Sequence, residues 1–275
     1  MENMQIQLEN VSKVYDGRTI IYPFHFAIQK GSSIAIVGHN GCGKSTLIKI
    51  MAGLIQPTTG KISYPNGKPM FHYLPEKFYP TPLKTREYLE RMGEIDGIPH
   101  KELKKKIEVL AEDFYVSEFL DTSMKLLSKG TLQKIGVIQA LLSEPEVMLL
   151  DEPLSGQDID SKKVFIHKIN KLREKGITIV ISCHEKELTD ALTEKQYIIQ
   201  NGYFREYHEK KKREFCLLLE KENVHKIPEG MEKYGTGFRL WVSEDEADGK
   251  ILNLLQEGWS LKGMYYEENM ECGEI

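Results

Sequence analysis

The sequence predicts an α/β fold, because short apolar segments of strand length alternate with segments of helical periodicity. Three of the apolar segments are typical of buried parallel strands: residues 34–37, 147–150 and 177–182. Phe165, Ile169 and Leu172 recur at spacings of four and three, which predicts one apolar face on a helix over residues 161–175. Gly176 then fits the C-terminal cap of this helix. A helix between two buried strands is the connection that a parallel sheet requires.

Length and composition fit one large domain with a small addition. The chain has 275 residues, of which 40% are hydrophobic and 28% are charged, and this is enough to bury a full core. No apolar run approaches the roughly 18 residues that a membrane-spanning helix needs, so we expect any membrane association to go through a partner. The N-terminus lacks a secretory pattern, which predicts a cytoplasmic protein. A net charge of -4 gives no general attraction to nucleic acid, and the four cysteines form no C-x-x-C pair typical of a zinc site.

Changes of pattern along the chain predict its organisation. Residues 1–205 contain the strand-like segments and form the predicted large domain. Within it, an insert at about residues 77–140 is predicted to be helical, because apolar residues recur at helical spacing after Pro99. The remainder, residues 206–275, is predicted to be a small α+β accessory region. It contains two alternating runs, a helical segment and a last strand-like segment, at residues 215–219, 238–242, 248–258 and 261–266.

A glycine-rich segment after the first predicted strand has the pattern G-x-x-x-x-G-K-[ST] of a phosphate-binding P-loop. A strand precedes it and a helical run over residues 44–52 follows, as such a loop requires. Glycines let backbone N–H groups approach phosphate oxygens, and the helix N-terminus adds partial positive charge. We expect Lys44 to contact the β- and γ-phosphates and the Ser45 hydroxyl to bind Mg²⁺. The residues predicted to hold the nucleotide here are Gly38, Asn40, Gly41, Cys42, Gly43, Lys44, Ser45 and Thr46.

An acidic pair, Asp151 and Glu152, follows the second predicted strand and fits the other half of such a site. Asp151 is expected to hold Mg²⁺ through water, and Glu152 to orient and polarise the water that attacks the γ-phosphate. By itself the pair also fits a helix N-terminus, where acids are favoured and Pro153 suits the first position. The P-loop about a hundred residues earlier favours the catalytic interpretation.

Further motifs follow one another in the order found in the ATP-binding cassette (ABC) family, which the chain resembles. Leu-Ser-Lys-Gly-Thr at residues 127–131 is similar to the family signature, usually LSGGQ, and Leu-Ser-Gly-Gln-Asp at residues 154–158 to its D-loop. His184 matches the switch histidine, Tyr15 the aromatic residue that stacks on adenine, and residues 73–76 the Q-loop. The matches span about residues 5–205. The resemblance implies a P-loop NTPase fold with a helical subdomain, ATP and Mg²⁺ as ligands, and ATPase activity.

Two motifs depart from the family pattern. Glu76 stands where the Q-loop usually has glutamine; a carboxylate can still bind Mg²⁺, although it adds negative charge beside the γ-phosphate. In the signature, Lys129 and Thr131 replace glycine and glutamine. Ser128 and the Gly130 N–H remain at the start of a predicted helix and can still meet a phosphate. Both variants resemble those of single-cassette exporter subunits.

The resemblance also implies partners. Two cassettes of this family meet head to tail, so we expect a homodimer or a heterodimer with a second ABC subunit. A membrane permease on a separate chain would place the protein at the inner face of the cell membrane, and an exporter is favoured. A non-transport ABC ATPase of the translation or repair type is the alternative, but this chain shows one cassette, and only about eighty residues separate the P-loop from the signature.

Several single residues also have simpler interpretations. Tyr15 fits a surface aromatic on a hairpin, and His184 a loop histidine with satisfied hydrogen bonds. Lys129 fits a solvated side chain as well as a contact to the opposing nucleotide. Cys42 occupies a free position of the P-loop pattern, so its side chain needs no role.

Overall fold

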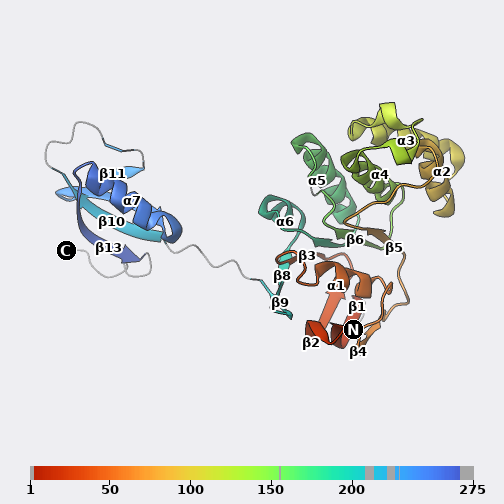
Figure 1. The fold of residues 1–275 in the computed structure, drawn as a ribbon, viewed down its shortest axis with the longest axis horizontal. Helices are drawn as coiled ribbons and strands as arrows, with labels where there is room; N and C mark the ends of the chain where they lie inside the picture. Colours follow the sequence, from red (N-terminus) through yellow and green to blue (C-terminus); the bar gives the residue numbers. More distant parts are fainter. Residues whose placement is uncertain (1–2, 155, 208–213, 222–226, 229, 267–275) are drawn as a thin grey trace. The chain divides into compact units, whose positions relative to one another are not determined.

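The computed structural model describes residues 3–154, 156–207, 214–221, 227–228 and 230–266. The chain divides into two compact units, Met1–Tyr207 and His208–Ile275 (Figure 1). Each unit has hydrophobic clusters of its own. Every residue predicted to bind nucleotide or metal belongs to the first unit.

A six-stranded, mainly parallel sheet forms the centre of the first unit. The strand order is β5-β6-β7-β3-β8-β9, and only β9 runs antiparallel to its neighbour. All residues of β6 and β7 are buried, as expected of strands covered on both faces. The α/β fold class and the three predicted strands are therefore confirmed. The bounds are β5 Phe71–Leu74, β6 Val147–Asp151, β7 Thr178–Ser182, β3 Ser33–Val37, β8 Lys195–Gln200 and β9 Tyr203–Glu206.

Helices cover one face of this sheet and part of the other. Met148 and Leu150 of β6 belong to a hydrophobic cluster shared with the helices of the insert, whereas Val147 and Leu149 belong to a cluster shared with α1. This alternation is what a two-residue strand period produces. The helices are α1 Lys44–Met51, α2 Thr85–Ile95, α3 His100–Asp113, α4 Lys129–Leu141, α5 Ile159–Glu174 and α6 Lys186–Leu192. Within the described residues, no helix has the length and apolar character needed to cross a membrane.

A second, antiparallel sheet in the order β2-β1-β4 was not among the sequence predictions. Its strands are β1 Met4–Tyr15, β2 Arg18–Gln29 and β4 Thr59–Ser63. Asp16 and Gly17 connect the first two with φ angles of 48° and 77°, as a two-residue type I′ turn requires. The Asp-Gly dipeptide is a local signal for this turn, and Tyr15, for which a hairpin was one interpretation, ends the first strand. Irregular register between Leu8 and Val11 breaks the alternation that would otherwise reveal the first strand.

In the part of the second unit that the structure describes, a four-stranded antiparallel sheet in the order β11-β12-β10-β13 contacts one helix. Phe215, Leu217, Leu240, Val242 and Trp259 are among the residues of its core. The helix begins four residues before the predicted residue 248, and β11 was not predicted. The elements are β10 Glu214–Glu220, β11 Met231–Tyr234, β12 Gly237–Ser243, α7 Glu244–Gln256 and β13 Ser260–Tyr266.

Candidate nucleotide-binding site

The P-loop connects β3 to α1, and its backbone conformation requires glycine at three positions. Gly38, Gly41 and Gly43 have φ angles of 144°, 79° and 114°, a range that other residues rarely adopt. A Cβ atom on Gly38 would lie 2.7 Å from Cys42 Sγ and 2.8 Å from a backbone oxygen of β8. Lys44 Nζ donates a hydrogen bond to the Gly38 carbonyl at 2.8 Å and so closes the loop around its own amine.

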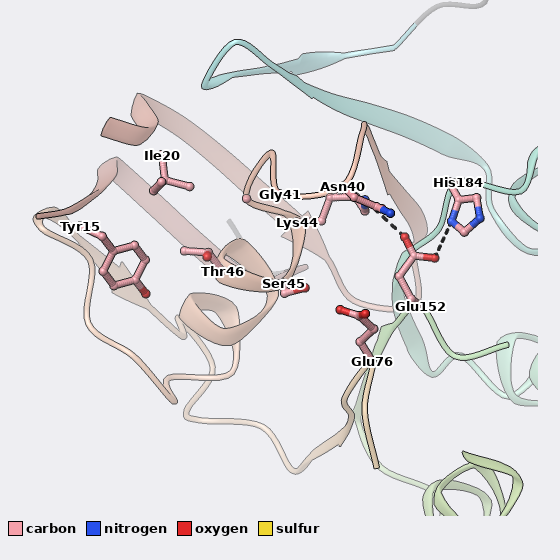
Figure 2. A pocket seen from close by; sticks show the side chains of 11 residues that line it. Tyr15, Ile20, Asn40, Gly41, Lys44, Ser45, Thr46, Glu76, Glu152 and His184 are labelled. Atoms are coloured by element: carbon pink, nitrogen blue, oxygen red, sulfur yellow. Dashed lines mark hydrogen bonds and ion pairs between the residues drawn. The ribbon is translucent and has the colours of Figure 1, made fainter. Parts of the chain in front are cut away.

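One cavity of about 310 Å³ gathers most of the predicted site residues. In Figure 2, Tyr15 and Ile20 lie at one end of it, Glu152 and His184 lie at the other, and Ser45 is between them. Segments that are distant in the sequence thus meet at one edge of the parallel sheet. The lining residues are Tyr15, Ile20, Asn40, Gly41, Gly43, Lys44, Ser45, Thr46, Glu76, Glu152 and His184.

Oxygen atoms suited to bind Mg²⁺ lie together at this cavity. The Ser45 hydroxyl donates to Asp151 Oδ1 at 3.0 Å, and Ser182 donates to the same oxygen at 2.6 Å. Asp151 is only 1% exposed, and the Glu76 carboxylate lines the adjoining cavity. A hydroxyl and carboxylates in this arrangement match the hard oxygen ligands that Mg²⁺ prefers. The residues present therefore fit a Mg²⁺ site.

A buried tyrosine hydroxyl adds a polar group to the same region. Within the described structure, the Tyr73 hydroxyl is buried without a hydrogen-bond partner. Burial raises the pKa of Tyr73 well above its usual value, and the negative charge of Asp151 acts in the same direction. A tyrosine hydroxyl is neutral at physiological pH even at its ordinary pKa, and this one lies close enough to Asp151 to donate toward its carboxylate.

Glu152 lies between a cation and a histidine. Its Oε1 is 3.3 Å from Lys44 Nζ, and its Oε2 is 2.9 Å from His184 Nδ1 (Figure 2). Among the described residues nothing donates a hydrogen bond to Oε1, although this atom is buried. A buried carboxylate oxygen that still has free acceptor capacity is suited to accept a proton from a water molecule.

The backbone of Glu152 is strained. Its φ angle is 47°, in the left-handed region that costs a residue other than glycine or asparagine about 1–3 kcal/mol. The Glu152 N–H donates to the hydroxyl and the carbonyl oxygen of Ser182, at 3.0 and 3.1 Å. Strain of this kind persists only where the surroundings fix the conformation, and it is often found at functional sites.

Some predicted residues lie outside the cavity. The Cys42 side chain is buried in the hydrophobic cluster beside α1, and its N–H is directed to the His39 carbonyl at 3.3 Å. Ser128 and Gly130 do not line the cavity. Ser128 is exposed and caps α4 by accepting a hydrogen bond from the Thr131 N–H at 3.1 Å. Of the D-loop, Ser155 lies outside the described residues, and Gln157 donates to the Gly130 carbonyl at 3.2 Å.

Three residues of the site were not singled out by the sequence. Ile20 lines the cavity, Ser182 holds both acidic residues, and Gln133 contacts the segments that follow β5 and β6. Ser182 ends a predicted strand, which was a usable signal for a residue at this sheet edge. The positions of Ile20 and Gln133 depend on packing between distant segments.

Comparison with known proteins decides the family. A sequence model described as ABC transporter matches residues 21–155. The chain is 32% identical over 200 residues to an uncharacterized ABC transporter ATP-binding protein of Methanocaldococcus jannaschii, covering 72% of this chain and 75% of the relative. This chain belongs to the ATP-binding proteins of ABC transporters. As an ABC-type ATPase subunit it binds and hydrolyses ATP.

Other relatives of this ABC subunit have named roles. It is 30% identical to the linearmycin resistance ATP-binding protein of Bacillus subtilis, over 72% of this chain and 67% of the relative. It is also 30% identical to a spermidine/putrescine import ATP-binding protein of Mesoplasma florum, over 74% of this chain and 61% of the relative.

Solved structures agree with the fold. The structure of an ATP-binding subunit of an ABC transporter is similar with a TM-score of 0.68 and 25% identity, covering 74% of this chain and 90% of that chain. A dimeric post-hydrolysis cassette bound to ADP and Pi has a TM-score of 0.66 and 23% identity, covering 74% and 99%.

Proposed function

We propose that this ABC subunit powers a separate membrane permease by hydrolysing ATP, with Mg²⁺, in the cavity beside the P-loop. The observation that carries the proposal is the convergence of Lys44, Asp151 and Glu152 at one sheet edge. These residues supply a phosphate-binding cation, a metal-binding acid and a base. Mg²⁺, when bound, would neutralise charge on the phosphates.

Each residue of the site has a proposed task. Lys44, now paired with Glu152, would turn its charge to the β- and γ-phosphates, which releases the Glu152 carboxylate toward water. Glu152 would take the proton of the attacking water, and His184 would hold Oε2 of that carboxylate. Ser45, Asp151 and Glu76 would hold the metal, with Ser182 orienting Asp151. The ring of Tyr15, which is 45% exposed, would stack on adenine.

The exposed signature supports the proposal of a dimer. Ser128 lies outside the cavity of its own chain, although its hydroxyl and the Gly130 N–H are groups that bind phosphate. We propose that they complete the site of a second cassette, either another copy of this chain or a related ABC subunit. Lys129, exposed beside them, would add positive charge to the same contact.

The proposed permease contact lies where the Q-loop enters the helical insert. Tyr79 is 74% exposed there, whereas Phe78 packs against Gly136 and Tyr88. We propose that the exposed Tyr79 ring, next to the partly buried Phe78, is part of the surface that the permease contacts. Such a contact would hold the subunit on the inner face of the cell membrane.

Export is the direction we propose, on the resemblance of the signature and Q-loop to single-cassette exporter subunits. The named relatives include both a resistance protein and an importer, so the direction needs a transport assay. The subunit would be purified from membranes with its permease, and ATPase activity and substrate movement would be measured in inside-out vesicles. Accumulation of substrate inside the vesicles would support export, and efflux from them would indicate import. Recovery with ribosomes, and without a membrane partner, would contradict the transport function.

A further inference from the structure

A buried glutamine on α4 connects the two acidic segments of the site. Gln133 Nε2 lies 3.2 Å from the Pro75 carbonyl oxygen and 3.5 Å from the Pro153 carbonyl oxygen. Pro75 directly precedes Glu76, and Pro153 directly follows Glu152. An amide NH₂ carries two hydrogens, so one side chain can donate to both carbonyls. We propose that Gln133 is a positioning residue: by holding the neighbouring carbonyls, it fixes Glu76 and Glu152 relative to the start of α4.

The burial of Gln133 makes these contacts difficult to replace. The residue is 5% exposed, and its contact with Pro153 is buried. Where water cannot enter, a carbonyl that loses its donor stays unsatisfied, and this costs more than the loss of an exposed hydrogen bond. A polar side chain among the apolar residues of α4 is therefore expected to have a specific task.

The strained conformation of Glu152 shows what that task is. Outside a tight turn, a strained left-handed conformation such as that of Glu152 persists where the surroundings fix it. Ser182 fixes the N–H of Glu152, and Gln133 holds the carbonyl of the next residue, Pro153. Gln133 is thus placed to determine where the Glu152 carboxylate points.

The same turns of α4 carry the signature. Gln157 donates to the Gly130 carbonyl, and Lys134 Nζ lies 2.8 Å from Asp158, which caps α5. These contacts join the start of α4 to the segment that follows Glu152. A phosphate bound at Ser128 and Gly130 by a second cassette would act on this joined unit, and Gln133 would pass the effect to Glu152. This part of the inference rests on the proposed function.

Gln133→Met tests the inference, because methionine keeps the length and unbranched shape but removes both donors. We expect kcat for ATP hydrolysis to fall about tenfold, the usual scale for losing a group that orients a site residue. ATP affinity should stay within about twofold, since Gln133 does not line the nucleotide cavity. The matched control is Gln139→Met on the same helix. Gln139 accepts a hydrogen bond from Tyr88 at 2.7 Å, so this change should alter thermal stability but not kcat.

A double-mutant cycle separates positioning from general stabilisation. If Gln133 acts through Glu152, Gln133→Met should cause little further loss in single-turnover rate once Glu152→Gln is present. Multiplicative losses, equal losses in both control and test variants, or an unchanged kcat for Gln133→Met would each overturn the inference. Failure of the proposed function is recognised separately, because Glu152→Gln alone would then turn over at the wild-type rate.

Discussion

The two motifs that bind phosphate differ in their surroundings. The P-loop meets the acidic residues inside a cavity of its own chain, whereas the signature is exposed and lies outside that cavity. Lys44 and Glu152 are both less than 10% exposed and contact each other within one chain. Ser128 is exposed on another segment and does not reach that cavity. Buried, paired charges need a fixed scaffold, while exposed donors at a helix N-terminus are available to a ligand from outside. On the proposed function, one chain would carry two different halves of a composite site.

The largest expected effect on turnover is that of replacing Glu152, inside the cavity beside the P-loop. Glu152→Gln keeps the shape of the side chain and its contact with His184 but removes the base, so turnover should fall by a factor of about 10²–10⁴. ATP binding should persist, and a dimer that cannot hydrolyse ATP should accumulate. Size-exclusion chromatography with ATP would show the variant eluting earlier than the wild type. Normal ATPase activity would remove Glu152 from its proposed task.

Gly130→Asp tests the exposed signature. Around a Cβ atom at Gly130 the nearest atoms are 3.8 Å away, so the helix should accept the side chain, while its charge would repel a phosphate. We expect ATP affinity of the single chain to be unchanged and turnover to fall about tenfold or more. Gly130→Ala is the control and should stay near the wild type. A loss of nucleotide affinity in the isolated chain would show that the signature serves its own cavity.

Glu76→Gln should have a smaller effect, on ATP affinity and on its Mg²⁺ dependence. The carboxylate lines the cavity, so its replacement removes one negative charge near the triphosphate and keeps one acceptor oxygen. Screened Coulomb repulsion predicts that ATP affinity holds or rises severalfold, with a change in Mg²⁺ dependence. Titration of ATP and Mg²⁺ would measure both, in the isolated chain and with the permease. No change in either setting would make Glu76 an ordinary surface acid.

Removal of the second unit should have the smallest effect. A chain that ends at Tyr207 retains all of β9, which ends at Glu206, and both hydrophobic clusters of the first unit. We expect its ATP affinity to stay within about twofold of the full chain, because all cavity residues precede this point. Calorimetric titration would measure it. A folded truncation that cannot bind ATP would place part of the site in residues 208–275.

The same comparison explains how much could be predicted from the sequence. The P-loop and the acidic pair are contiguous patterns next to apolar strands, so their residues and their common sheet edge could be predicted locally. A hairpin at Tyr15 was considered, and Asp16-Gly17 marks its turn, but the strands β1 and β2 were not predicted because their register is irregular. Gln133 could not be found, since its partners lie 58 and 20 residues away and neither is charged.

Each active site is proposed to use the P-loop of one cassette and the signature of another. Lys44→Ala disables the first half and Gly130→Asp the second, so each variant alone should hydrolyse ATP poorly. In a mixed dimer, one site would combine an intact P-loop with an intact signature. Mixing the two purified variants should therefore restore ATPase activity well above the sum of the separate rates. Activity that stays at that sum, while the two variants are shown to associate, would contradict a composite site.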